Sequence, residues 1–415
     1  MKSVAIIGGG IIGRISAFVL SEEGYQVTVF DSSQKLTAPS WNNAGHIAVE
    51  QVTPLSSYAS IRTAPKRLFR VGGALDFNLF SPGVASWVWR YLRASSPSRF
   101  KAGTEALASL VNQAETSWQA LTTRAHVPDV YQGTGHWVVW ESAGSATAAS
   151  RHWSGSNTGN AQFTALAPSQ MELVRQRTHA HVENGIAFSG TGRITNLPLL
   201  ADTLKKAIID NGGNWENRAI SPLTQANGKA VIPAFERDFD AVVMCAGAAS
   251  GRLLRHIYPN VPLIAERGYH LEVSCTEEMW PSNTPPLVFE DRSMIVTRFA
   301  NTLRACSFVE FSDLDAPADE RKWQRLLEHC KALGLPIGDD AKKWMGARPT
   351  LPDYLPAIGK SQRASNLYYA FGHQHLGLTL GAITGEKLAA MITGNPSPSE
   401  LKPFDIERFK IRRTN

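Results

Sequence analysis

Residues 4–13 read VAIIGGGIIG. The four apolar residues before the glycines are typical of a parallel β-strand that is buried on both faces. An apolar pattern of helical period follows the glycines and ends at Gly24, where we expect a left-handed helix cap. Val27 to Phe30 then predicts a second strand, which closes at Asp31. The start of the chain therefore predicts a βαβ unit.

The glycines have the spacing Gly8-x-Gly10-x-x-Gly13 between that strand and that helix. In this context the first glycine allows a tight turn, the second lets the backbone approach a pyrophosphate, and the third lets the helix pack closely on the strand. The helix N-terminus offers free N–H groups to the phosphates. Asp31 is placed to accept hydrogen bonds from a ribose hydroxyl. The pattern predicts a dinucleotide site and leaves NAD and FAD as alternatives.

Two later segments also end a predicted strand at glycine. Residues 241–245 read AVVMC and run into Gly247, and residues 367–371 read LYYAF and run into Gly372. Asn196 is placed to cap a helix before the first of these strands, and a helix ending at Gly394 follows the second. We expect the three units to contribute to one sheet.

The stretches between these units have a different character. Apolar residues at helical spacing from Leu107 to Leu121 predict one amphipathic helix. Residues 269–273 predict a strand, and the Ser/Ala/Gly-rich residues 142–159 predict a loop. We therefore expect an α/β fold in which two domains interleave. A discontinuous Rossmann-like nucleotide-binding domain takes residues 1–50, 191–254 and 346–415, and an α+β substrate domain takes residues 51–190 and 255–345.

Composition excludes several classes of protein. The 415 residues include 42 Lys+Arg and 36 Asp+Glu, a net charge of +6, but no long run of basic residues, so we expect no nucleic-acid partner. Four cysteines without a CxxC pair indicate reduced thiols and a cytoplasmic location. No window is apolar enough for a membrane span. The basic tail, residues 408–413, leaves open a peripheral contact at the inner membrane face.

Three further segments carry a resemblance to a known family. They are the small polar residues 40–46, SWNNAGH, the tetrapeptide GARP at 346–349, and residues 372–379, GHQHLGLT. With the glycine fingerprint, the chain resembles the FAD-dependent D-amino acid dehydrogenases and, more widely, the glycine oxidase and D-amino acid oxidase family. The resemblance implies that the dinucleotide is FAD. Arg14, Trp41 and the paired histidines at 373 and 375 depart from the family's usual residues.

Position by position, the resemblance implies which residues contact FAD. Residues 40–46 are similar to the loop beside the pyrophosphate and flavin, 245–247 to the turn that closes on the phosphates, and 372–379 to the loop whose helix points at the flavin pyrimidine edge. The implied cofactor residues are Gly8, Gly10, Ile11, Ile12, Gly13, Asp31, Ser32, Ser40, Asn43, Ala44, Gly45, His46, Ala219, Cys245, Ala246, Gly247, Gly372, His373, His375, Leu376, Gly377, Leu378 and Thr379.

Arg348 matches the arginine that holds the substrate carboxylate in glycine oxidase-like members. A bidentate arginine fixes a carboxylate so that the substrate Cα–H points at flavin N5, and Pro349 keeps Arg348 in an extended conformation. Tyr269 and His270 are expected to line the substrate side of the flavin, with core packing as the alternative.

The two histidines near the C-terminus have two interpretations. His373 and His375 share one face of an extended segment, as metal ligands do, but no third ligand lies nearby in the sequence. We therefore expect no metal. His375 is expected to line the flavin near the substrate, with a structural histidine as the alternative.

These observations predict an FAD-dependent enzyme that oxidises a D-amino acid to its imino acid, with a cyclic amine such as D-proline or D-hydroxyproline as a narrower version. One alternative is a sarcosine- or opine-type amine oxidoreductase, acting as a subunit of a complex. Another is a dinucleotide-binding module without catalysis. The electron acceptor is left open among quinone, oxygen and a partner protein, because the flavin supplies the reactive chemistry and no residue pattern reports its reoxidation.

Overall fold

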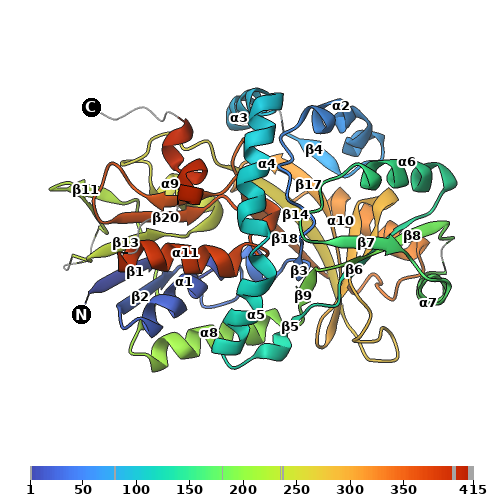
Figure 1. Ribbon diagram of the computed structural model, residues 1–415, viewed down its shortest axis with the longest axis horizontal. Coiled ribbons are helices and arrows are strands. Elements are labelled where there is room, and N and C mark those ends of the chain that lie inside the picture. Colours follow the sequence, from blue (N-terminus) through green and yellow to red (C-terminus); the bar gives the residue numbers. More distant parts are fainter. Residues whose placement is uncertain are drawn as a thin grey trace.

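Three strands that end at glycine turns lie side by side in the computed structural model (Figure 1), which describes residues 2–78, 81–179, 181–233, 235, 238–394 and 399–409. They are β1 (Ser3–Ile7), β13 (Ala241–Met244) and β20 (Leu367–Phe371), and each pairs in parallel with the next. The expectation that distant parts of the chain share one sheet is confirmed.

The first sheet has six strands in the order β10-β2-β1-β13-β20-β19. Its pairs are parallel except that of β20 with β19, which is antiparallel. The strands not yet defined are β2 (Gln26–Asp31), β10 (Asn214–Asn217) and β19 (Ala357–Lys360). Because β1 is buried on both faces, its apolar run has no polar alternation.

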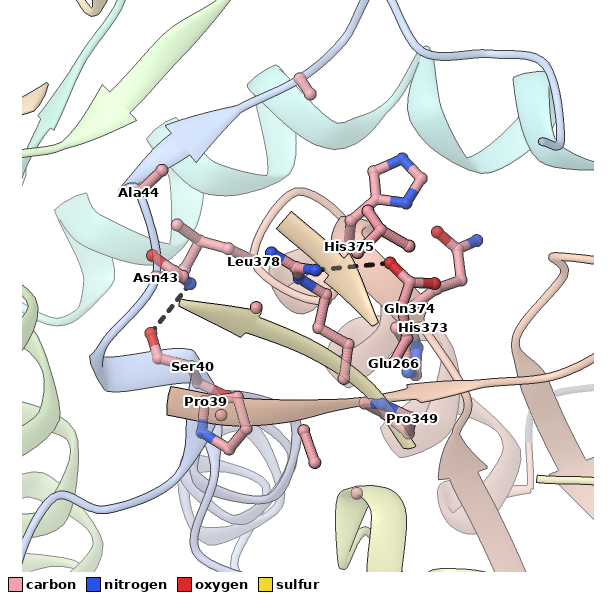
Figure 2. A pocket seen from close by; sticks show the side chains of 18 of the residues that line it. Pro39, Ser40, Asn43, Ala44, Glu266, Pro349, His373, Gln374, His375 and Leu378 are labelled. Atoms are coloured by element: carbon pink, nitrogen blue, oxygen red, sulfur yellow. Dashed lines mark hydrogen bonds and ion pairs between the residues drawn. The ribbon is translucent and has the colours of Figure 1, made fainter. Parts of the chain in front are cut away.

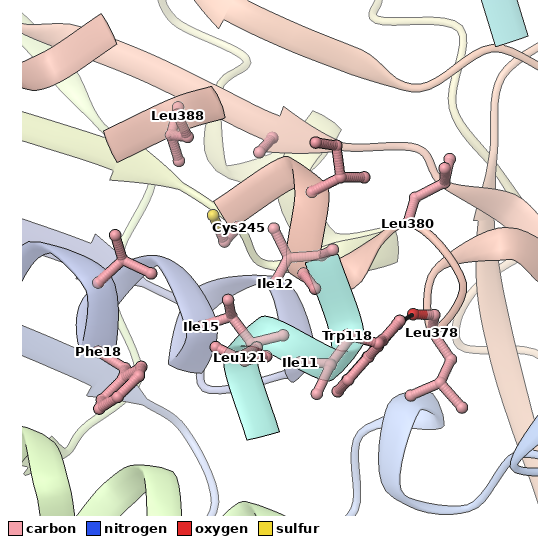
Figure 3. Close-up of a cluster of buried hydrophobic side chains, with 14 of the residues drawn as sticks. Ile11, Ile12, Ile15, Phe18, Trp118, Leu121, Cys245, Leu378, Leu380 and Leu388 are labelled. Carbon is pink, nitrogen blue, oxygen red and sulfur yellow. Dashed lines mark hydrogen bonds between the residues drawn. The ribbon is translucent and has the colours of Figure 1, made fainter. Parts of the chain in front are cut away.

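Three helices cover one face of this sheet. Helix α1 (Ile11–Glu22) lies between α8 (Leu197–Asp210) and α11 (Gly381–Thr393), and all three contribute to one apolar core. Figure 3 shows residues of α1 and α11 in this core. The expected caps are confirmed, since Gly24 and Gly394 have positive φ and the Asn196 side chain accepts a hydrogen bond from the Leu199 amide. Sequence signals at the helix ends were therefore reliable here.

The opposite face of the sheet buries a second apolar cluster that includes Phe30, Tyr258 and Tyr369. The elements beside it are short, namely β11 (Thr224–Ala226), β12 (Lys229–Val231) and α9 (Ser250–Leu253). Near the C-terminus, Arg408 pairs with Asp353 at 2.7 Å. The rest of the basic tail, residues 410–413, lies outside the described residues.

A second, nine-stranded sheet forms the other half of the molecule (Figure 1). Its order is β18-β14-β17-β16-β15-β6-β8-β7, with β4 paired to β17. The bounds are β4 (Leu75–Phe77), β6 (His136–Trp140), β7 (Gln162–Ala165), β8 (Asn184–Ser189), β14 (Ile264–Ser274), β15 (Leu287–Phe289), β16 (Met294–Arg298), β17 (Thr302–Ser312) and β18 (Lys342–Thr350).

Helices accompany this sheet, and a small sheet lies beside both domains. The helices are α2 (Tyr58–Arg67), α3 (Pro82–Ala94), α7 (Pro168–Thr178) and α10 (Glu320–Ala332). The small sheet contains β3 (His46–Ile47), β9 (Gly192–Ile194) and β5 (Tyr131–Gln132). Within the described ranges, no helix combines the length and the apolar composition that crossing a membrane requires.

The prediction of one helix from Leu107 to Leu121 is wrong. The segment forms two helices, α4 (Pro97–Val111) and α5 (Ala114–Arg124), with the break at Asn112 and Gln113. The Asn112 carbonyl accepts a hydrogen bond from the Asn160 side chain at 3.1 Å, outside the helix ladder. The apolar periodicity continues across the break because both helices pack on the same core.

The prediction of a loop over residues 142–159 is also wrong, because helix α6 spans Ala143–Ser154. The Ser142 hydroxyl caps this helix by accepting a hydrogen bond from the Ser145 amide at 3.2 Å. Alanine has the highest helix propensity and serine is a preferred N-cap. The composition was therefore compatible with a helix as well as with a loop.

The packing of α4 and α5 bears on the domain boundaries. These helices follow residue 50, yet Leu107, Leu110 and Trp118 are buried in the same core as β1 and α1. Arg348, by contrast, lies on β18 of the second sheet although it follows residue 346. The proposed boundaries remain a prediction, and the cores indicate that the chain crosses between the two halves more often than those boundaries suppose.

Candidate active site

A cavity of about 2040 Å³ lies between the two halves of the molecule. In Figure 2, Ser40, Asn43 and Ala44 border it on one side, and Glu266 and His375 on the other. The predicted residues that line it are Gly8, Gly10, Ile11, Ile12, Asp31, Ser32, Ser40, Asn43, Ala44, Gly45, His46, Ala219, Cys245, Ala246, Gly247, Tyr269, His270, Arg348, His373, His375, Gly377 and Leu378. The other predicted cofactor residues are not part of this lining, namely Gly13, Gly372, Leu376 and Thr379.

Gly8 and Gly13 form the tightest contact of the glycine fingerprint. A Cβ atom on Gly13 would lie 1.9 Å from the Gly8 carbonyl oxygen, and one on Gly8 would lie 2.4 Å from the Cys245 carbonyl oxygen. Gly8 also has a φ of 112°, which side chains disfavour. Helix α1 can therefore begin directly against the ends of β1 and β13.

The N-terminus of α1 points its amides towards the cavity. Gly10 precedes the helix and provides no side-chain cap, and the Ile11 amide donates to the Ser40 hydroxyl at 3.2 Å. The amides of a first helical turn attract anions because they lack partners within the helix. Ser40, from a different loop, thus takes one donor of this turn and fixes the position of the loop beside it.

Arg14 has a structural position beside the fingerprint. Its guanidinium donates to the carbonyls of Gly9 at 2.9 Å and Ala201 at 2.7 Å. It also lies over the rings of Trp41, at 5.1 Å, and Trp215, at 4.5 Å. Arg14 and Trp41 both differ from the residues usual in the family that the chain resembles. The two differences occur together because the arginine packs on the tryptophan.

Asp31 ends β2 at the edge of the cavity. Burial raises the pKa of its carboxyl, while a hydrogen bond from the Ser33 amide and the charge of Arg14 oppose that shift. A Cβ on the neighbouring Gly9 would lie 2.2 Å from an Asp31 oxygen. The carboxylate is therefore held close to the glycine turn, where a ribose hydroxyl of the dinucleotide is expected.

The loop of residues 40–46 is fixed by its own side chains. Asn43 donates to the Ser40 carbonyl at 2.9 Å and accepts from the Gly45 amide at 2.7 Å. Gly45 has a φ of 69°, and a Cβ there would lie 2.7 Å from the Phe299 ring. The Asn-Ala-Gly sequence is therefore required by the local backbone of this loop.

The C-terminal loop is held from two sides. Thr379 accepts a hydrogen bond from the Ala48 amide at 2.9 Å. The Trp118 ring nitrogen donates to the carbonyls of Leu378 at 3.0 Å and Thr379 at 3.2 Å (Figure 3). His373 hydrogen bonds to Thr384 of α11 at 3.1 Å, and burial lowers its pKa to about 3. His373 is thus a neutral residue that links the loop to the last helix.

Arg348 projects from β18 opposite Glu266 of β14, as a directly paired cross-strand residue. Its Nη1 lies 3.4 Å from Glu266 Oε1 and donates to the Phe308 carbonyl at 3.3 Å. Its side chain is 26% exposed, whereas that of Glu266 is 1% exposed. The remaining N–H groups of the guanidinium are therefore available to a ligand in the cavity.

Glu266 is a site residue that the sequence reasoning missed. Its Oε2 accepts hydrogen bonds from Thr350 at 3.0 Å and Tyr354 at 3.1 Å, so the carboxylate is held in the wall. A Cβ on Gly268 would lie 2.3 Å from Arg348 Nη2. Glu266 and Gly268 together define where the guanidinium lies, and no local sequence signal marks Glu266, because its role depends on the pairing of β14 with β18.

The three other residues predicted near the substrate differ in their surroundings. The Tyr269 hydroxyl donates to Glu310 and accepts from the Asp319 amide. His270 hydrogen bonds to the Asn42 carbonyl at 2.9 Å and stacks on Trp344. His375 has a buried Nδ1 without a partner among the described residues. Their roles at the substrate stay predictions, and Tyr269 has both of its hydroxyl contacts within the protein wall.

Comparison with known proteins assigns the family. The model of the family "FAD dependent oxidoreductase" matches residues 3–391. The chain belongs to this family. It is 27% identical to a D-amino-acid oxidase of Bradyrhizobium diazoefficiens, over 98% of this chain and 99% of that protein, and 25% identical to a D-amino acid dehydrogenase of Neisseria gonorrhoeae with the same coverage.

Solved structures share the fold of this FAD dependent oxidoreductase. Glycine oxidase from Geobacillus kaustophilus superposes with a TM-score of 0.74 at 18% identity, covering 98% of this chain and 99% of that one. Iminodiacetate oxidase from Chelativorans sp. gives 0.70 at 18% identity, with 97% and 98% covered. The predicted α/β fold of the glycine oxidase and D-amino acid oxidase type is confirmed.

The residues of the cavity fit FAD, the cofactor of this family. The volume of about 2040 Å³ exceeds the range of about 300–1,000 Å³ typical of small-ligand sites. The turn at Gly247 is open, because a Cβ there would meet no atom within 4 Å. The glycine turn and α1 would hold the pyrophosphate, Asp31 the ribose, and the loops of residues 40–46 and 372–379 the flavin.

Replacing Gly13 should impair FAD binding. In Gly13→Ala the new Cβ would meet the Gly8 carbonyl oxygen, so α1 must shift away from the phosphate site. We expect the dissociation constant for FAD to rise at least tenfold, about 1.4 kcal/mol, in a flavin fluorescence titration of the apoprotein. Gly144→Ala, in open space at the start of α6, is the control, and an equal loss there would contradict this assignment.

His270 should make stability depend on pH. Burial, and secondarily the charge of Arg304, lowers its pKa to about 3 in the folded state. The unfolded chain has a pKa near 6.5 and takes up the proton first, so stability is lost as pH falls below 6.5. The free energy of unfolding, measured with urea, should fall between pH 7 and pH 5 in the parent. In His270→Gln this fall should be about 2 kcal/mol smaller. The exposed His126→Gln should behave as the parent.

Proposed function

We propose that the protein oxidises a D-amino acid to its imino acid, which water hydrolyses to a 2-oxo acid and ammonia. The observation that carries the proposal is Arg348, a partly exposed guanidinium in the wall of the FAD cavity whose position is fixed by Glu266 and Gly268. The two relatives named for D-amino acid oxidation, at 27% and 25% identity over nearly the whole chain, support the choice of substrate class.

Binding and orientation are the tasks of this chain in the proposed reaction. FAD, when bound, accepts the hydride from the substrate Cα. Arg348 would hold the carboxylate through its free N–H groups, and the walls of the cavity would exclude water from the reacting carbon. If the amine is delivered neutral, the hydride leaves Cα directly and the reaction requires no protein base.

His375, which lines the cavity near Arg348, is an uncharged part of the wall at neutral pH. Burial lowers the pKa of His375 to about 4, the charges of Glu266 and Glu50 oppose this shift, and the charge of Arg348 adds to it. His375 is thus neutral at pH 7, and Arg348 supplies the positive charge for a substrate carboxylate. This arrangement favours a substrate with a single carboxylate near the flavin.

A narrower proposal is that the substrate amine is cyclic, as in D-proline or D-hydroxyproline, whose imine product can remain a ring. The alternative is a sarcosine- or opine-type amine oxidoreductase, and the fold likeness to iminodiacetate and glycine oxidases keeps N-substituted glycines in the test.

The four cysteines, 245, 275, 306 and 330, are unpaired, which supports a reducing, cytoplasmic location. Electrons would pass to quinone, to oxygen or to a partner protein.

A substrate panel tests the proposed function. Holoenzyme is mixed anaerobically with D- and L-amino acids, the D- and L-prolines, sarcosine and iminodiacetate, and flavin bleaching is recorded. We expect rapid bleaching with a D-amino acid and none with its L-enantiomer. Bleaching by N-substituted glycines alone would favour the alternative, and a flavin that no amine reduces would reject catalysis on amines. Adding oxygen or a soluble quinone to the reduced enzyme then identifies the acceptor.

Arg348→Leu tests the role of the guanidinium. We expect kcat/KM for the substrate identified in the panel to fall by an amount on the order of 2–4 kcal/mol, because the carboxylate loses its charged partner. The FAD content and spectrum should stay as in the parent. Arg321→Leu, at an exposed arginine on α10, is the matched control. An unchanged kcat/KM in Arg348→Leu would remove this residue from the substrate site.

A further inference from the structure

Three potential metal ligands converge at one end of the cavity. His46 lies on β3, Glu50 follows four residues later, and His136 begins β6 of the second sheet. One donor atom from each lies within 4.8 Å of the other two. All three residues line the cavity, and the proposed amino acid oxidation assigns no role to Glu50 or His136.

The distances suit a divalent metal ion. His46 Nε2 and Glu50 Oε1 are 3.3 Å apart. Two ligands of a tetrahedral zinc ion, each about 2.0–2.1 Å from the metal, are separated by about 3.4 Å. The observed pair therefore has the spacing of two ligands on one ion, although 3.3 Å also allows a weak hydrogen bond.

The surroundings of His136 match those of a metal-binding histidine. Its Nδ1 lies 3.0 Å from the Thr191 hydroxyl, which leaves Nε2 as the nitrogen for a ligand. Its ring stacks on Phe188 with an interplanar angle of 4°, and the residue is 3% exposed. Ligating histidines are usually held through their second nitrogen in this way.

Two buried atoms of the cluster have no hydrogen-bond partner among the described residues. They are His46 Nδ1 and Glu50 Oε2. The Glu50 side chain is 4% exposed, and the structure records no lysine or arginine paired with it within the described ranges. A buried carboxylate is stabilised by a compensating cation, and the partner recorded for Glu50 is His46, which carries a charge only when it is protonated.

A second cluster of three acidic residues shows how the protein satisfies such groups elsewhere. Asp76, Glu310 and Asp319 also bring their donor atoms within 4.8 Å of one another. There the fully buried ammonium of Lys322 lies 2.7 Å from Asp76, 2.9 Å from Asp319 and 3.6 Å from Glu310. That cluster therefore has a permanent cation in the chain, whereas no lysine or arginine is paired with Glu50 among the described residues.

We propose that His46, Glu50 and His136 bind a divalent metal ion of the zinc class. Three protein ligands leave the fourth tetrahedral position to water or to a ligand in the cavity. The ion would join the loop of residues 40–46 to the second sheet and would add positive charge to the cavity wall. The expectation of no metal rested on the four cysteines without a CxxC pair and on His373 and His375, whereas these three ligands come from distant parts of the sequence.

Zinc binding by the holoenzyme tests the proposal. The protein is purified with FAD, freed of any affinity tag and of metal, and titrated with zinc chloride by calorimetry. We expect one zinc per chain with a dissociation constant in the micromolar range or tighter. Zinc K-edge absorption should report nitrogen and oxygen ligands including two imidazoles. Absence of binding at 100-fold excess zinc, or sulfur in the first shell, would overturn the proposal.

Variants locate the ion. Glu50→Gln and His136→Gln should each weaken zinc binding at least tenfold, and zinc should raise the Tm of the parent but not of these variants. Glu183→Gln is the matched control, because His181 and Glu183 form an exposed His–Glu pair at 3.0 Å outside any such three-ligand cluster. Unchanged affinity in both cluster variants would place the zinc elsewhere and reject this site. FAD absorbance confirms that each variant is folded. The zinc measurements do not depend on the substrate panel, so the zinc site and the proposed amine oxidation are tested separately.

Discussion

A very close approach between backbone segments lies where α1 meets the end of β1. The space between the Gly8 carbonyl and Gly13 admits no side chain, and the Cys245 carbonyl closes on Gly8 from β13. Because these contacts bring two strands and one helix to a single point, the loops that follow β1, β13 and β20 open onto the same cavity. That close approach determines where the phosphate site lies. It also determines the positions of the loops of residues 40–46 and 372–379.

The opposite wall of the cavity is built on a different constraint, the pairing of the buried Glu266 carboxylate with the partly exposed Arg348 guanidinium. Glu266 is bound by Thr350, Tyr354 and Arg348 and is almost inaccessible. An arginine held in this way loses little side-chain freedom when it receives a carboxylate. Removing Arg348 would take away the charged partner of the buried Glu266, which would then keep only its hydrogen bonds from Thr350 and Tyr354. The antiparallel register of β14 and β18 thus determines where a substrate carboxylate can lie.

The sequence predicted the parts of the fold that are set by local chemistry. The glycine fingerprint, the cap at Asn196 and the apolar runs of β1, β13 and β20 each carry their information within a few residues. The break between α4 and α5 was not predictable, because the asparagine side chain that binds the Asn112 carbonyl comes from residue 160. Helix α6 was missed because its small residues suit helix and loop alike.

The residues of the candidate site also differ in whether the sequence alone could predict them. Arg348 was found from a local motif, whereas Glu266 is recognisable only once β14 lies beside β18. His46 and Glu50 are near neighbours in the sequence, but His136 reaches them from another sheet. Arg14 and Trp41 looked like isolated departures from the family pattern, and the structure shows that they pack on each other. Contacts between distant segments account for each of these gaps.

The position of α1 between the two ends of the chain has a consequence for biosynthesis. This helix is translated long before α11, which packs on it. Gly385 of α11 lies against Ile15 so closely that a Cβ there would be 2.5 Å from the isoleucine side chain. The apolar face of α1 therefore stays without α11 until Gly381–Thr393 has been translated. Chains that end before α11 expose the part of this face that α11 covers, and exposed apolar surface favours aggregation during folding.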